Sequence, residues 1–179
     1  RYLSSAASDV YKRQTYISSS TISKVNRNEK VIVDDLFIDI FRKSKIIYEK
    51  TNGYFDPSIG LLLDYAGFGP IKNQNIVSED SLAIILKTVG FDKIDIVDGH
   101  VRKLNNKSKL DFNAIAKGYA VDVISEFLNS KSIEDYMVDI GGEIRTSGKN
   151  HLRDMFWSIA IENPCLLYTS DAADDRYRG

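Results

Sequence analysis

The sequence predicts an α+β fold in which an antiparallel sheet packs against helices. Three observations support this class. The segments 36–47 and 116–128 carry apolar residues at helical spacing. Two short apolar segments flank Asp98-Gly99, a pair of residues typical of the two-residue turn in a β-hairpin. A further β segment, 136–140, is followed by a Gly-Gly pair and another short β segment.

The first half of the chain is predicted to be mainly helical. Asp34 can cap a helix that covers 36–47, and Asn52-Gly53 ends it because glycine accepts the left-handed conformation after a last turn. The stretch from Tyr54 to Gly69 is expected to be loop with a short helix, since a proline and three glycines interrupt it. Ser78 begins another helix, which stops near the next glycine.

The second half is predicted to combine strands with one long helix. That helix begins within the motif around Lys117, and its apolar residues recur at helical spacing from Ala116 to Leu128. The predicted strands are 94–97, 101–104, a short one at Leu110-Asp111-Phe112, then 136–140, 143–146 and 157–161.

Both ends of the chain are predicted to be foreign to the domain. Residues 4–14 read SSAASDVYKRQ and residues 165–174 read CLLYTSDAAD. Both strings back-translate to the transposon end of sequencing-library adapters, and the second is the reverse complement of the first in another frame. We therefore assign residues 1–14 and 165–179 to translated adapter DNA and expect residues 15–164 to be one partial domain.

Composition excludes several classes of function for residues 15–164. The single cysteine, Cys165, falls in the second foreign end, so neither disulfide nor thiolate chemistry is expected. The whole chain has a formal net charge of −1, and this balance argues against nucleic acid or an anionic membrane as the main partner. No apolar run reaches the roughly 18 residues of a membrane span.

The first motif with possible chemistry is GYFDPSIG, which runs from Gly53 to Gly60. Pro57 fixes its own φ and pushes Asp56 toward an extended backbone. The aromatic pair Tyr54-Phe55 then stands beside an oriented carboxylate, and together they could bind a planar ring. The alternative is a proline-containing turn with two core aromatic residues.

The second motif is LDFNAIAKGY, from Leu110 to Tyr119. The carboxylate of Asp111 comes directly before a predicted helix, and the N-terminus of a helix favours phosphate. Lys117 adds a positive charge, and a main-chain carbonyl at this position could ligate Mg²⁺. The alternative is an ordinary strand-to-helix junction with an aspartate cap and a solvated lysine.

The third motif is DIGGEI, from Asp139 to Ile144. Its adjacent glycines allow a ligand to approach the backbone closely, or else they form a β-bulge. His100 and His151 have no Cys, Glu or second His at metal-ligand spacing, so both are expected to be surface residues.

In order along the chain, these segments resemble the ApbE family. The resemblance covers nearly all of residues 15–164 and implies the flavin transferase fold of that family, incomplete at both ends. The segments that carry it are YISSSTISKVN (16–26), TNGYFDPSIGLLLDYAGFG (51–69), VGFDKIDI (89–96), LDFNAIAKGYAVD (110–122), MVDIGGEIRTSG (137–148) and WSIAIENP (157–164).

The resemblance implies an enzyme that transfers FMN from FAD to a Thr or Ser hydroxyl of a target flavoprotein, with Mg²⁺ and with release of AMP. It assigns a Mg²⁺ ligand to the main-chain carbonyl of Ala114 and no catalytic residue. Asn113 stands where the family more often has glycine, which narrows the site. The residues implied to contact FAD are Tyr16, Tyr54, Phe55, Asp56, Asp111 and Lys117.

The resemblance also implies what lies outside residues 15–164. A flavin-contacting methionine is expected upstream of Thr15, and an Asp and a Thr that ligate Mg²⁺ are expected beyond Pro164. One carbonyl with waters should hold Mg²⁺ poorly, so we expect the chain as written to be inactive. Two alternatives stay open, namely a flavin-binding or carrier module and an FAD pyrophosphatase that releases FMN and AMP.

Partner and location are likewise implied by the resemblance. The acceptor would be a flavoprotein such as a subunit of a membrane redox complex, with no nucleic-acid partner. The protein would act outside the cytoplasm, in the periplasm or lipid-anchored at the cell membrane.

Overall fold

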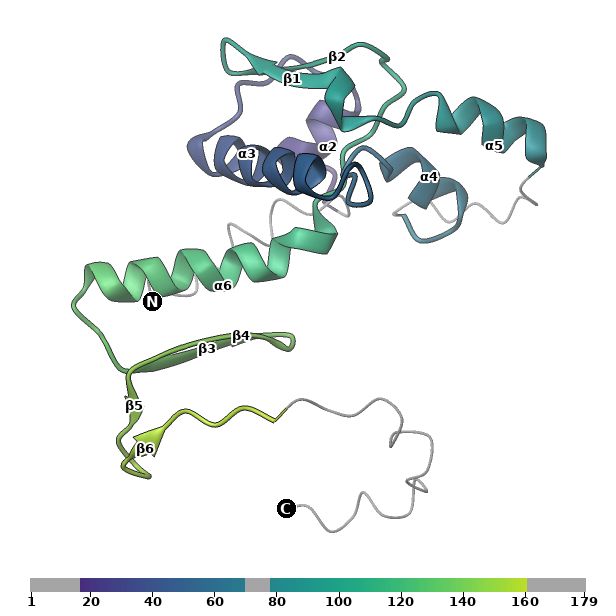
Figure 1. The fold of residues 1–179 in the computed structure, drawn as a ribbon. Coiled ribbons are helices and arrows are strands. Elements are labelled where there is room, and N and C mark those ends of the chain that lie inside the picture. The colour runs from purple at the N-terminus through teal and green to yellow at the C-terminus, as the bar shows by residue number, and fades with distance from the viewer. Residues whose placement is uncertain (1–16, 70–77, 161–179) are drawn as a thin grey trace, which may run out of the picture.

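The structure, a computed structural model, describes residues 17–69 and 78–160 (Figure 1). No helix within these residues combines the length and the apolar character needed to cross a membrane. The helical elements are α2 (Thr21–Asn26), α3 (Asp35–Lys50), α4 (Gly60–Tyr65), α5 (Glu79–Leu86), the 3-10 turn η1 (Phe91–Lys93) and α6 (Asn113–Ser130). The strands are β1 (Ile94–Val97), β2 (His100–Lys103), β3 (Tyr136–Ile140), β4 (Glu143–Ser147), β5 (Lys149–Asn150) and β6 (Met155–Phe156).

The predicted cap at Asp34 and the predicted helix start at Ser78 are confirmed. The side chain of Asp34 accepts a hydrogen bond from the backbone N–H of Phe37 at 2.9 Å, which satisfies a donor at the start of α3. The helix ends before Asn52-Gly53, as predicted. Ser78 caps α5 in the same way, because its hydroxyl accepts from the N–H of Ser81 at 3.2 Å.

The strands pair as antiparallel hairpins, β1 with β2, β3 with β4 and β5 with β6. The predicted turn at Asp98-Gly99 is confirmed, since the φ angles of these residues are 51° and 72° and Val97 pairs with His100. Strand β2 begins one residue earlier than predicted. The mixture of helices with small antiparallel sheets is the α+β class that the sequence predicts.

Two predicted strands are wrong. Leu110-Asp111-Phe112 is not a strand, because its backbone pairs with the side chain of Asn26 and with the carbonyl of Pro57 instead of a continuous ladder. Residues 157–160 are not a strand either, because no strand of the described ranges pairs with them. The indole of Trp157 instead donates to the carbonyl of Ser147 at 2.9 Å, and Ile161 lies outside the described residues.

Helix α6 takes part in two hydrophobic cores. The larger core lies under α2, α3 and the β1–β2 hairpin, and α6 contributes Tyr119 to it. The smaller core lies between α6 and β3, where Val121 meets Tyr136 and Val138. Figure 1 shows the resulting arrangement, with α3 and the β1–β2 hairpin on one side of α6 and the β3–β4 hairpin on the other.

Candidate functional site

The first motif forms a tight turn shortly after α3. The backbone N–H and the hydroxyl of Ser58 both donate to Oδ1 of Asp56, at 2.7 and 2.6 Å. The same hydroxyl accepts from the N–H of Gly90 at 2.7 Å, and Ser58 is fully buried. Ser58 therefore orients the carboxylate of Asp56, and the backbone of Gly90, which is distant in the sequence, in turn holds the hydroxyl of Ser58.

The two aromatic residues of this turn differ in exposure. Tyr54 is 97% exposed, so the interpretation of both rings as core residues is wrong. Phe55 is half-buried, and its N–H donates to the hydroxyl of Thr51 at 3.1 Å. An exposed phenol ring beside an oriented carboxylate is available to stack on a planar ligand.

The second motif joins this turn to the start of α6. The N–H of Asp111 donates to the carbonyl of Pro57 at 2.7 Å, and the N–H of Gly60 donates to the carbonyl of Lys109 at 3.0 Å. The carboxylate of Asp111 accepts from the N–H of Asn113 at 2.7 Å and from its side-chain amide at 3.0 Å. Asp111 is buried. Its carboxylate supports the first turn of α6, and its backbone N–H is bonded to the first motif.

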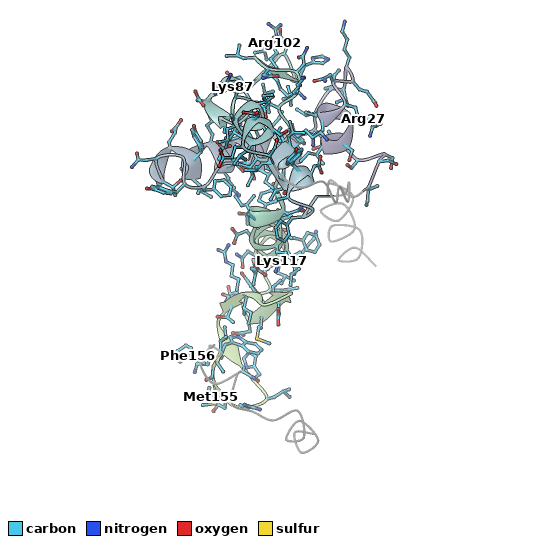
Figure 2. The ribbon with its side chains drawn as sticks, turned by 90° about the vertical axis from the view of Figure 1, so that its right-hand side faces the viewer. Arg27, Lys87, Arg102, Lys117, Met155 and Phe156 are labelled. Carbon is cyan, nitrogen blue, oxygen red and sulfur yellow. The ribbon has the colours of Figure 1, made fainter. Side chains whose placement is uncertain are left out.

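Lys117 connects α6 to the third motif. Its ammonium group donates to the carbonyl of Gly141 at 3.2 Å and pairs with the carboxylate of Glu143 at 2.9 Å. Ile140 pairs with Glu143, so Gly141-Gly142 is a two-residue hairpin turn and the bulge interpretation is wrong. Figure 2 shows Lys117 between the upper helical part and the hairpins below, which end near Phe156.

The structure therefore brings most of the predicted site residues to one region. Tyr54, Phe55 and Asp56 form the turn that contacts the Asp111 segment through the backbone. Ala114 is exposed in the first turn of α6, and Lys117 follows about one turn later. Tyr16 lies outside the described residues.

A cavity of about 610 Å³ opens between α3, α6 and β4. Apolar residues of both helices line it, together with Lys43, Asp122 and Arg145. Of the predicted site residues within the described ranges, Ala114 is the one that lines this cavity. The cavity therefore lies beside the predicted flavin contacts and does not enclose them.

The oxygen ligands that Mg²⁺ prefers are incomplete in the described part of the chain. Within residues 17–69 and 78–160, no group of three or more His, Cys, Asp or Glu side chains could hold a metal. Each carboxylate oxygen of Asp111 accepts a hydrogen bond from Asn113. The described residues therefore do not supply a complete Mg²⁺ site around the carbonyl of Ala114, and no chemical step through a metal follows from them.

Two residues that organise the site have no predicted role in the sequence. Ser58 orients Asp56, and the side chain of Asn26 binds the backbone of Leu110. Their partners lie far along the chain, 32 residues away for Ser58 and Gly90, and 84 residues away for Asn26 and Leu110. A motif spacing does not report such contacts. The only signal is that both residues fall within segments that resemble the family.

Known proteins resemble this chain over most of its length. The sequence profile of the ApbE family matches residues 8–175. The FAD:protein FMN transferase of Vibrio cholerae serotype O1 is 34% identical over 157 residues, which is 85% of this chain and 46% of that protein. The FAD:protein FMN transferase of Haemophilus influenzae is 33% identical over 162 residues, with 86% and 46% covered. The chain spans about half the length of the curated relatives it matches.

Solved structures agree with the predicted fold. The flavin transferase ApbE from Vibrio cholerae matches with a TM-score of 0.83 and 30% identity over 91% of this chain and 54% of that one. The apo form of the Pseudomonas stutzeri flavinyl transferase ApbE matches with a TM-score of 0.82 and 26% identity over 89% and 55%. The prediction of a flavin transferase fold is confirmed.

Proposed function

The chain belongs to the ApbE family, and from this premise we propose that it supplies the flavin-binding part of an FMN transferase. The enzyme would move FMN from FAD to a Thr or Ser hydroxyl of a target flavoprotein and release AMP. One observation carries the proposal. The hydrogen bond from the N–H of Asp111 to the carbonyl of Pro57 brings together two motifs that the resemblance assigns to FAD.

Each motif offers a different part of FAD a chemically suitable partner. The exposed ring of Tyr54 can stack on a planar ring, and the oriented carboxylate of Asp56 can accept hydrogen bonds from its N–H groups. The start of the 18-residue helix α6 and the ammonium group of Lys117 favour the negative charge of a diphosphate. Tyr16 belongs to the proposed contacts through the resemblance.

Mg²⁺ belongs to the proposal on the ground of the resemblance. The carbonyl of Ala114 would be one ligand, and the remaining ligands would come from outside the described residues. We also propose that the acceptor is a subunit of a membrane redox complex and that the protein acts in the periplasm or at the cell membrane.

A chimera tests the proposed function. Residues 15–160 of this chain would replace the matching segment of the Vibrio cholerae enzyme, a relative that is 34% identical. The chimera is incubated with FAD, Mg²⁺ and a peptide that carries the acceptor Thr or Ser. Covalent flavin is read by in-gel fluorescence and mass spectrometry, and AMP by chromatography. We expect one AMP for each flavin attached to the peptide.

Controls separate the proposed activity from its alternatives. Free FMN and AMP with no labelled peptide would favour an FAD pyrophosphatase, and FAD binding without turnover would favour a carrier; either result contradicts transfer. Asp111→Asn in the chimera should lower transfer. Asp122→Asn is the matched control, because Asp122 lies on α6, the helix that follows Asp111, and pairs with Arg145 at the surface. The 179-residue chain alone should bind FAD without transfer.

A further inference from the structure

The side-chain amide of Asn26 forms two hydrogen bonds with one distant residue. Its Nδ2 group donates to the carbonyl of Leu110 at 2.8 Å, and its Oδ1 atom accepts from the N–H of Leu110 at 2.7 Å. Because the donor and the acceptor of the amide are both used, the orientation of the amide is fixed. The side chain therefore pairs with the backbone of Leu110 as a residue of a neighbouring β-strand would.

The segment 109–111 has one edge bonded to Asn26 and the other edge bonded to the first motif. On the other edge, Ile59 forms a parallel bridge with Lys109, and the N–H of Asp111 donates to the carbonyl of Pro57. Leu110 is fully buried, so its N–H and carbonyl need partners within the protein. Without the amide of Asn26, these two groups would lose the partners that they have.

A second side chain ties the same two segments together. The ammonium group of Lys103 donates to the carbonyl of Val25 at 3.1 Å and to the carbonyl of Ser108 at 3.0 Å. The end of α2 is thus bonded to the chain on the N-terminal side of Asp111 at more than one point. Val25 is buried in the larger core, which anchors this end of α2.

The position of Asp111 depends on this arrangement. Asp111 directly follows Leu110, and its carboxylate holds the first turn of α6, where Ala114 lies. We propose that Asn26 is a positioning residue for FAD binding, which fixes Asp111 and the start of α6 against the Asp56 turn while touching only the backbone of Leu110. This inference rests on the proposed function.

The test replaces the amide without changing its shape. Asn26→Asp keeps the acceptor for the N–H of Leu110 and places a second oxygen against its carbonyl. FAD binding to the 179-residue chain is followed by flavin fluorescence, and backbone hydrogen exchange is followed over residues 109–117. We expect faster exchange in this segment and FAD binding weakened about tenfold, the scale seen when a residue that orients a ligand-binding group is lost. Asn26→Ala should have the larger effect.

Asn28→Asp is the matched control, because it keeps the shape of the side chain and tolerates the φ of 61° at this position, which would strain alanine. Asn28 lies just beyond the same helix, and its side-chain amide donates to the carbonyl of Asn106 at 3.1 Å, so it also joins this region to a distant backbone. Asn106 precedes the site segment and contacts none of its predicted residues through this bond. The control should change neither exchange over 109–117 nor FAD binding. Thermal unfolding of all variants shows whether they remain folded.

The outcomes distinguish this inference from the proposed function. If the unmodified chain does not bind FAD, the proposed function fails and the inference fails with it. If the unmodified chain binds FAD and Asn26→Asp binds it equally well, the proposed function stands and the positioning role is overturned, whatever the exchange rates. Equal weakening by Asn28→Asp would also overturn it, because the effect would then be general destabilisation.

Discussion

The ammonium nitrogen of Lys117 lies 2.9 Å from a carboxylate oxygen of Glu143, which joins α6 to the first residue of β4. The two side chains are 51% and 42% exposed, so solvent screens the pair. Exposed ion pairs of this kind contribute about 0–1 kcal/mol to the free energy of unfolding. Lys117 can therefore exchange this partner for an anionic ligand at little cost in stability.

Lys117→Met should weaken FAD binding and leave the fold intact. The variant removes a positive charge near the start of α6, so the loss of affinity should be smaller at high salt, where charges are screened. Its free energy of unfolding should fall by at most about 1 kcal/mol. FAD titrations at low and high salt, with urea denaturation, measure both effects. Lys131→Met at the end of α6 is the control and should not change affinity.

Phe91→Ala should destabilise the larger core. The ring of Phe91 is fully buried and lies 4.7 Å from the ring of Phe41 and 6.0 Å from the ring of Tyr48, between centroids. Its loss should cost about 3–5 kcal/mol of unfolding free energy. Urea denaturation measures the change. Phe156→Ala, at a ring that is 74% exposed, should stay within about 0.5 kcal/mol of the unmodified chain; equal losses would contradict the assigned core.

Gly148→Ala should destabilise the chain more than Gly142→Ala. Both glycines have positive φ, 61° and 92°, so alanine at either position is strained by about 1–2 kcal/mol. A Cβ at Gly142 would meet open space, whereas one at Gly148 would collide with the carboxylate of Asp135. That carboxylate accepts from the N–H of Lys149 at 2.6 Å and binds His151. Hydrogen exchange over 149–156 should rise only in Gly148→Ala, and the reverse order would refute the assigned contact.

Stability should rise with pH through the titration of Lys103. Burial, together with the nearby charge of Lys109, lowers the pKa of Lys103 from 10.5 to about 8. Between these values the unfolded chain binds more protons at this residue than the folded chain, so folding is favoured as pH increases. Lys103→Met should reduce the increase in unfolding free energy between pH about 8 and pH about 10.5. Urea denaturation at pH values below and above this range measures the increase. Lys107→Met, at an exposed lysine, should keep the rise seen in the unmodified chain.

Local signals predicted the elements whose partners are close in sequence. Asp34 and Ser78 cap the helices that follow them, and Asp98-Gly99 forms the predicted hairpin turn. Leu110-Asp111-Phe112 was predicted as a strand and is not one, because a strand needs a neighbouring strand and the sequence does not show which partner its backbone will find. The same holds for residues 157–160.

The sequence by itself determined which residues are candidates for flavin binding, since Tyr54, Asp56, Asp111 and Lys117 lie in segments that resemble the family. Only the tertiary structure decided how they meet. The hydrogen bonds from Asp111 to Pro57 and from Lys117 to Gly141, and the pairing of Asn26 with Leu110, join segments up to 84 residues apart. Residue type sets the chemistry of a side chain, but the packing of the whole chain sets the distance between that side chain and the other residues of the site.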